Sequence, residues 1–150
     1  MPLQNVSTND ELIAKFVETT RGLFSGKRLL LVEDMWLNRE IINTLLSESG
    51  LSIDEAEDGL EAFAIIKSYP ERYHLVFMDI EMPKMVGLEA TRQIRSLPSE
   101  GAKSIPIVAM TGNDDREDVE KCFIAGMNDH IAKPIDVDYL LAIMKKYLCE

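Results

Sequence analysis

Residues 74–79 read His-Leu-Val-Phe-Met-Asp, a short apolar run that ends in a carboxylate. A run of this length and composition is typical of a strand buried on both faces of a parallel sheet. Similar short runs, alternating with amphipathic helices, occur at Arg28–Val32, Leu51–Glu57, Ser104–Met110 and Asn128–Ala132. This alternation predicts an α/β fold, a doubly wound five-stranded parallel sheet with helices on both faces.

The helices are predicted from apolar spacing. After the first strand, a helix that ends near Gly50 is marked by the apolar residues Leu37, Ile41, Ile42, Leu45 and Leu46. One additional helix, Ser7–Arg21, precedes the first strand, with Thr8 and Glu11 as a capping box. We therefore divide the chain into an N-terminal helix and linker, residues 1–26, and one α/β domain, residues 27–150.

Composition narrows the class of protein. The chain has 150 residues, which suits one core, and its 16 basic and 26 acidic residues give a net charge of −10. That charge argues against direct binding to nucleic acid, which requires a basic face. Cys122 and Cys149 fit no metal or redox spacing. The sequence has neither a secretory signal nor an apolar run long enough to cross a bilayer, so we expect a cytoplasmic domain without direct membrane contact. A larger parent protein can still carry a membrane anchor.

Polar side chains follow four of the predicted strands. They are Glu33 and Asp34 after the first strand, Asp79 after the third, Thr111 after the fourth and Lys133 after the fifth. Because ligands of such sheets bind beyond the carboxyl ends of the strands, we expect these groups to converge. Taken singly, each has an ordinary interpretation as a loop cap, a turn former, a helix cap or a surface lysine. Their coincidence at one edge indicates a site.

The residue types at this edge suit phosphoryl chemistry. Three crowded carboxylates repel one another, and a divalent cation with oxygen ligands, Mg²⁺ or Mn²⁺, relieves that repulsion. An aspartate can act as a nucleophile and form an acyl phosphate, which makes Asp79 the candidate acceptor. Lys133 and Thr111 can neutralise and hydrogen-bond the oxygens of the transferred group.

The segment Val76–Pro83, continued by Gly87–Thr91, closely resembles the receiver (response-regulator) domain of two-component signalling, most of all receivers of hybrid sensor histidine kinases. Leu31–Asp34, Met110–Gly112 and Ala132–Pro134 match the other blocks of the family in order. The resemblance covers roughly Lys27 to Tyr147 and implies a flavodoxin-like strand order, 2-1-3-4-5.

Matched position by position to the motifs of the family, the sequence has Asp79 where the resemblance implies the phospho-acceptor. The resemblance implies a metal held by Glu33, Asp34, Asp79 and the backbone carbonyl of Glu81. Thr111 and Lys133 would sense the phosphoryl group, and the Lys133–Pro134 bond would be cis. His130 stands where the family usually carries a switch Tyr or Phe, and its alternative interpretation is an ordinary strand residue.

The resemblance implies a phospho-acceptor domain of a phosphorelay. The donor would be a phosphohistidine on a histidine kinase or a histidine phosphotransfer domain. Phosphorylation would then alter the face formed by the helix Asn113–Ala125, the fifth strand and the last helix. A dimer through this face, or through the N-terminal helix, is a further expectation. The domain's own chemistry would be limited to its phosphorylation and dephosphorylation, whereas the parent protein could be a hybrid histidine kinase.

Several alternatives remain open at this point. The chain could be a stand-alone response regulator or a phosphate shuttle. A flavin-binding module is disfavoured because the loop Glu33–Trp36 would repel phosphate. An aspartyl-phosphate phosphatase, with Glu81 as second acid, would lack a substrate pocket. The N-terminal helix is interpreted as a connector from a preceding kinase core, as a dimerisation stripe, or as a lid on the domain.

Overall fold

The computed structural model describes residues 9–80, 86–112 and 116–149. Its five strands are all parallel, in the order β2-β1-β3-β4-β5. They are β1 (Arg28–Val32), β2 (Ser52–Ala56), β3 (Leu75–Asp79), β4 (Ile107–Thr111) and β5 (Asp129–Ala132). The predicted doubly wound sheet and its strand order are therefore confirmed.

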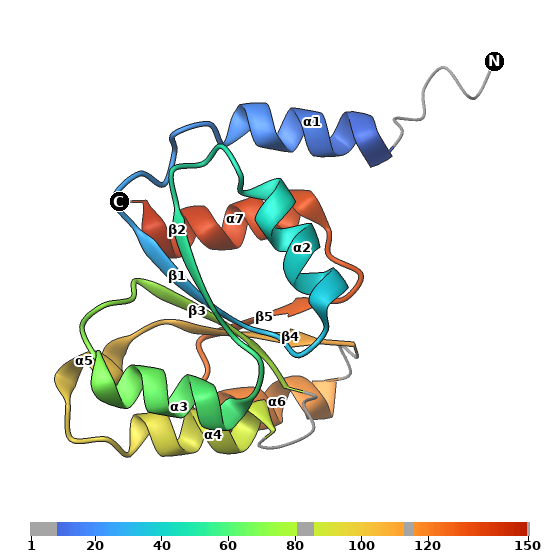
Figure 1. Cartoon of the computed structure of the whole chain (residues 1–150). Helices are drawn as coiled ribbons and strands as arrows, with labels where there is room; N and C mark the ends of the chain where they lie inside the picture. The colour runs from blue at the N-terminus through green and yellow to red at the C-terminus, as the bar shows by residue number, and fades with distance from the viewer. Residues whose placement is uncertain (1–8, 81–85, 113–115, 150) are drawn as a thin grey trace.

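Helices cover both faces of the sheet (Figure 1). The helices are α1 (Asn9–Thr19), α2 (Trp36–Leu45), α3 (Gly59–Ser68), α4 (Gly87–Arg95), α5 (Glu100–Ser104), α6 (Arg116–Ala125) and α7 (Val137–Leu148). Figure 1 shows α2 and α7 on one face and α3, α4 and α6 on the other. Among the described residues, none of these helices is long and apolar enough to cross a bilayer.

Strand side chains alternate between two buried clusters, because successive residues of a strand point to opposite faces. Leu31, Phe77 and Ile131 pack with α2 and α7. Leu30 and Met78 pack on the other face, in the cluster that contains residues of α3, α4 and α6. The sheet is thus a rigid plate buried on both sides, and the ends of its strands are fixed in position.

The fourth strand begins later than the sequence predicts. Its predicted start, Ser104, is the last residue of α5, and β4 begins at Ile107. The Ile105 N–H donates to the Gly101 carbonyl over 2.9 Å, and the Ser104 hydroxyl donates to the Glu100 carbonyl over 2.8 Å. These bonds complete one helical turn before Pro106, so the extended segment is shorter than the prediction.

Helix α1 is packed onto the sheet domain. Phe16 of α1 and Phe24 of the following turn are buried in the cluster shared by α2 and α7. The Phe24 N–H donates to the Ser49 carbonyl over 2.9 Å, and Arg21 pairs with Glu48 over 2.8 Å. Thr8, the predicted N-cap, lies outside the described residues. The N-terminal helix therefore shares the core of the domain that follows it.

Candidate functional site

On the sheet face covered by α2 and α7, the buried apolar residues of β1, β3 and β5 are each followed by a charged residue at the strand end. In each strand the residue two positions after a buried apolar residue lies on the same face, so Leu31 is followed by Glu33, Phe77 by Asp79 and Ile131 by Lys133. The strands therefore deliver two carboxylates and an ammonium to one edge. Only 1% of the Glu33 side chain and 5% of the Asp79 side chain are exposed.

Lys133 joins the two buried acids. Its Nζ donates to Glu33 Oε1 over 2.8 Å and to Asp79 Oδ2 over 3.2 Å. Burial lowers the pKa of Lys133, but the hydrogen bonds and negative charges of Glu33 and Asp79 outweigh burial and raise this pKa above its ordinary value. Lys133 is therefore a fixed cation at neutral pH.

The acids form a cluster suited to a cation. Glu33, Asp79 and the half-buried Asp34 each offer a carboxylate oxygen, and these oxygens lie within 4.8 Å of one another. Hard oxygen donors at this spacing are the ligands that Mg²⁺ prefers, and Lys133 balances only part of the negative charge. The donor set therefore fits a divalent metal ion. Glu81, whose carbonyl was predicted as a further ligand, lies outside the described residues.

Arg39, which the sequence analysis did not single out, holds the acidic loop. Its Nη1 donates to the Glu33 carbonyl over 2.8 Å, and its Nε and Nη2 pair with Glu55 over 3.4 Å and Glu57 over 3.8 Å. One guanidinium thus links the ends of β1 and β2 to α2. One sequence feature could have identified Arg39: it is a basic residue near the start of a helix that follows an acidic loop.

Thr111 and His130 lie on the opposite face of the sheet from Lys133. Thr111, 1% exposed, ends β4 beside Ala132, and its carbonyl accepts from the Lys133 N–H over 2.8 Å. His130 precedes Ala132 by two residues and so shares the face of Thr111. The His130 Nδ1 is buried and has no hydrogen-bond partner among the described residues. The Lys133–Pro134 peptide bond is cis.

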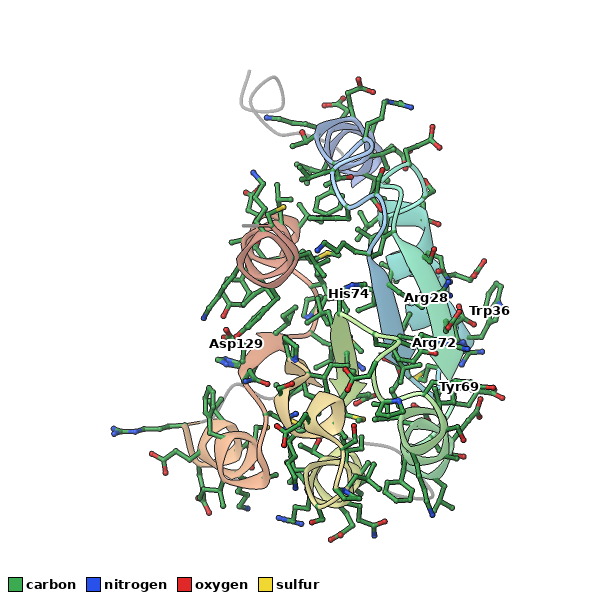
Figure 2. All side chains as sticks on the ribbon, turned by 90° about the vertical axis from the view of Figure 1, so that its left-hand side faces the viewer. Arg28, Trp36, Tyr69, Arg72, His74 and Asp129 are labelled. Carbon is green, nitrogen blue, oxygen red and sulfur yellow. The ribbon has the colours of Figure 1, made fainter. Side chains whose placement is uncertain are left out.

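His74 is far from this edge, at the start of β3. Its Nδ1 accepts a hydrogen bond from the Arg28 N–H over 3.0 Å. Figure 2 labels both residues. Because Arg28 begins β1 whereas Glu33 follows its end, His74 lies at the amino end of the sheet. This contact joins the starts of β1 and β3 and gives His74 a structural role away from the acid cluster.

A glycine allows α4 to start directly against the end of β3, the strand that carries Asp79. A Cβ on Gly87 would overlap the carbonyl oxygen of Asp79 and would lie 2.9 Å from the Cα of Ile80. No side chain fits there without movement of the backbone that carries Asp79. The glycine of the Gly87–Thr91 motif is therefore a packing requirement of the site.

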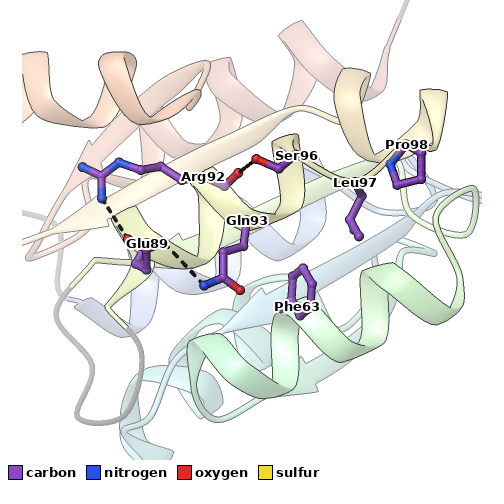
Figure 3. A pocket seen from close by; sticks show the side chains of 7 residues that line it. All are labelled: Phe63, Glu89, Arg92, Gln93, Ser96, Leu97 and Pro98. Carbon is purple, nitrogen blue, oxygen red and sulfur yellow. Dashed lines mark hydrogen bonds and ion pairs between the residues drawn. The ribbon is translucent and has the colours of Figure 1, made fainter.

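A shallow pocket of about 360 Å³ lies away from the site, between α3 and α4 (Figure 3). Its polar groups bond within α4: Gln93 donates to Glu89 over 3.4 Å, and the Ser96 hydroxyl donates to the Arg92 carbonyl over 2.9 Å. This arrangement stabilises a helix surface and offers no acid cluster. The chemistry is concentrated at the strand ends.

The family model described as the response regulator receiver domain matches residues 29–145. The chain belongs to this family. It is a receiver domain of the two-component phosphorelay type, and the flavodoxin-like fold expected from its sequence is that of its relatives. Helix α1 precedes the matched residues.

This receiver is 39% identical over 146 residues to hybrid signal transduction histidine kinase B of Dictyostelium discoideum, covering 89% of the chain and 7% of that kinase. It is 36% identical over 148 residues to transcription factor SKN7 of Saccharomyces cerevisiae, covering 99% of the chain and 23% of that protein. The receiver thus spans less than a quarter of the length of these two relatives.

Two solved receivers share its fold. The receiver of sensor histidine kinase PA1611 from Pseudomonas aeruginosa, with a magnesium ion in its active-site cleft, is 34% identical, with a TM-score of 0.74 over 84% of this chain and all of that one. The receiver of Ssk1 from S. cerevisiae, crystallised with the histidine phosphotransfer protein Ypd1, is 31% identical, with a TM-score of 0.75 over 84% of this chain and 91% of that one.

Proposed function

We propose that Asp79 accepts a phosphoryl group from a phosphohistidine, with Mg²⁺ or Mn²⁺ held by Glu33, Asp34 and Asp79. The observation that carries the proposal is the buried Asp79 carboxylate, held by Lys133 inside a cluster of acids at the carboxyl end of a central strand. The magnesium ion in the cleft of the PA1611 receiver supports the choice of metal.

In the proposed reaction a carboxylate oxygen of Asp79 attacks phosphorus. The P–O bond to Asp79 forms as the P–N bond of the phosphohistidine breaks, and the electron pair of that bond returns to the imidazole nitrogen. When bound, the divalent cation neutralises negative charge on the phosphoryl oxygens. Lys133 orients Asp79 before transfer and offers its ammonium to the new phosphoryl oxygens afterwards.

Phosphorylation is proposed to act on the surface formed by α6, β5 and α7, named here the α6–β5–α7 face. Thr111 would turn its hydroxyl toward the phosphoryl group, and His130, on the same face of the sheet, would follow into the space beside it. Ligand-linked change of this kind shifts the populations of two existing states. The carbonyl of Glu81 belongs to the same proposal, as an additional metal ligand.

The donor is proposed to be a histidine phosphotransfer domain or a histidine kinase. The Ypd1 complex of the Ssk1 receiver supports the first of these. Similarity to a hybrid kinase supports the proposal that this receiver is part of such a kinase. The transcription factor SKN7 contains a similar segment, so a response regulator is the alternative parent. In either case the receiver is proposed to act in the cytoplasm. Dimerisation through the α6–β5–α7 face or through α1 remains a prediction.

The test is the intact mass of the protein after incubation with phosphoramidate and MgCl₂. The wild type is expected to gain one phosphoryl group, and the gain should vanish in Asp79→Ala and in excess EDTA. Asp10→Asn, in the exposed first turn of α1, is the control and should gain the group normally. Equal gain by Asp79→Ala and the wild type would overturn the assignment.

A further inference from the structure

A groove of about 840 Å³ runs from α1 to the acid cluster. Its walls are α1, α2 and the segment from the end of β5 into α7, three parts that lie together in Figure 1. The apolar lining residues include Leu12 and Ile13 of α1, Leu37 and Ile41 of α2, and Ile135 and Val137. Glu33 and Lys133 line it as well, so the groove opens onto the proposed acceptor site.

The groove leaves large apolar side chains in contact with solvent. The exposed fractions are 41% for Leu12, 59% for Leu37 and 43% for Ile41. Met35 and Trp36, at the start of α2, are exposed as well. A concentration of exposed apolar residues on two helices and beside a reactive group is typical of an interaction surface. Helix α1 lines this surface without filling it.

Helix α1 is held in place by its packing on the core of the domain. Phe16 is buried in the core and Ile13 packs against the same cluster. The Thr20 hydroxyl donates to the Phe16 carbonyl over 2.9 Å, which closes the last turn of the helix. Since α1 precedes residues 29–145, the segment matched by the family model, this chain adds a wall to the receiver fold.

Charge narrows the choice of occupant. Glu40, Asp136 and Asp138 line the groove, and among its described lining residues Lys133 is the one cation, itself paired with Glu33 and Asp79. A second copy that docked here by the same groove would set one row of acids against another, which opposes self-association at this surface. The groove therefore suits a partner whose apolar side chains are flanked by basic ones.

We propose that α1 forms part of the docking surface for the phosphoryl donor. The donor would lay an amphipathic helix into the groove, with its apolar side chains against Leu12, Leu37 and Ile41 and its basic side chains toward the acidic rim. Its phosphohistidine would then face Asp79. This inference rests on the proposed function, and it adds α1 as a determinant of which donor is accepted.

The test measures phosphoryl transfer to the full chain from phosphorylated Ypd1 of S. cerevisiae, and in parallel from phosphoramidate. Leu12→Ser and Leu37→Ser should each lower the second-order rate constant with Ypd1 about fivefold to tenfold, as expected for interface anchors. Leu60→Ser is the matched control: Leu60 is 51% exposed on α3 and should leave the rate within about twofold. All three variants should react with phosphoramidate at the wild-type rate.

Each other outcome has a definite meaning. Loss of transfer in Leu37→Ser alone, or faster transfer in Leu12→Ser, would overturn the docking role of α1. So would a wild-type chain that reacts with phosphoramidate but not with Ypd1. A dimer in sedimentation analysis that Leu12→Ser abolishes would assign the groove to a second copy. Failure with both donors would instead refute the proposed function.

Discussion

The ammonium of Lys133 donates to the carboxylate of Glu33 over 2.8 Å, although the two residues are 100 positions apart in the chain. Lys133 follows β5 and Glu33 follows β1, and β4 and β3 lie between these strands in the sheet. The lysine side chain therefore extends across the strand ends to the acid cluster. Its Nζ also donates to the Asp79 carboxylate, which lies between the two strands. One cation thus holds two acids that would otherwise repel each other.

Replacement of Lys133 by Met should make the free energy of unfolding more dependent on magnesium. Two nearly buried carboxylates lose their shared partner, which should lower the free energy of unfolding without metal by about 3 kcal/mol. Without the competing ammonium the acids should bind Mg²⁺ more tightly, so one fixed MgCl₂ concentration should stabilise the variant more than the wild type. At 100 times the variant's dissociation constant the gain is about 2.7 kcal/mol. Urea denaturation with and without MgCl₂ measures both effects. Lys146→Met, which breaks an exposed pair with Asp129, is the control. An equal response to Mg²⁺ in the wild type and Lys133→Met would contradict the prediction.

Replacement of Arg39 by Lys should weaken magnesium binding about tenfold, the effect expected when a group that orients metal ligands is altered. A lysine keeps the charge but cannot reach the Glu33 carbonyl, Glu55 and Glu57 together. Titration with MgCl₂, followed by the fluorescence of Trp36, gives the affinity, because this single tryptophan lies two residues after Asp34. Arg21→Lys, whose partners Glu18 and Glu48 are exposed, should bind Mg²⁺ normally.

The stability of the fold should decrease at high pH through Tyr73. Burial and a 2.7 Å hydrogen bond to Asp54 raise the pKa of Tyr73 to about 12. The folded state therefore holds this proton more tightly than the unfolded state, in which the pKa is about 10. The contribution is complete below about pH 10 and is lost as the pH rises toward 12. Urea denaturation at several pH values between about 10 and 12 measures the free energy of unfolding. As the pH rises, this free energy should fall less in Tyr73→Phe than in the wild type or in Tyr69→Phe.

The parts of the site that could be predicted follow from strand periodicity. Glu33, Asp79 and Lys133 continue buried apolar rows, so their convergence follows from a parallel sheet and needs no knowledge of side-chain contacts. Arg39 could not be predicted in this way, because its value depends on three acceptors from two strand ends that only the folded chain brings together.

The exposed apolar residues of α2 show a second limit of prediction from sequence. Leu37 and Ile41 marked the helix correctly, and periodicity alone would bury them, yet both face the groove. An apolar stripe specifies which residues share a helix face, but it does not specify whether a neighbouring element covers that face. The early start predicted for β4 has a similar cause, because a single turn such as α5 is too short to produce a helical period.

His130 provides the last prediction, which concerns the buried Nδ1 atom of its imidazole. Nδ1 is buried without a hydrogen-bond partner in the described part of the chain, and a buried unpaired polar group costs about 1–3 kcal/mol. His130→Phe keeps a ring of similar shape and removes that atom, so the free energy of unfolding should rise by about 1 kcal/mol. The same substitution at His74 should lower it by about 0.5–1 kcal/mol, since the Arg28 N–H loses its acceptor. Urea denaturation of the two variants therefore compares one chemical change in two environments. If both variants were destabilised alike, the imidazole of His130 would have a partner, and its position beside Thr111 would have to be reinterpreted.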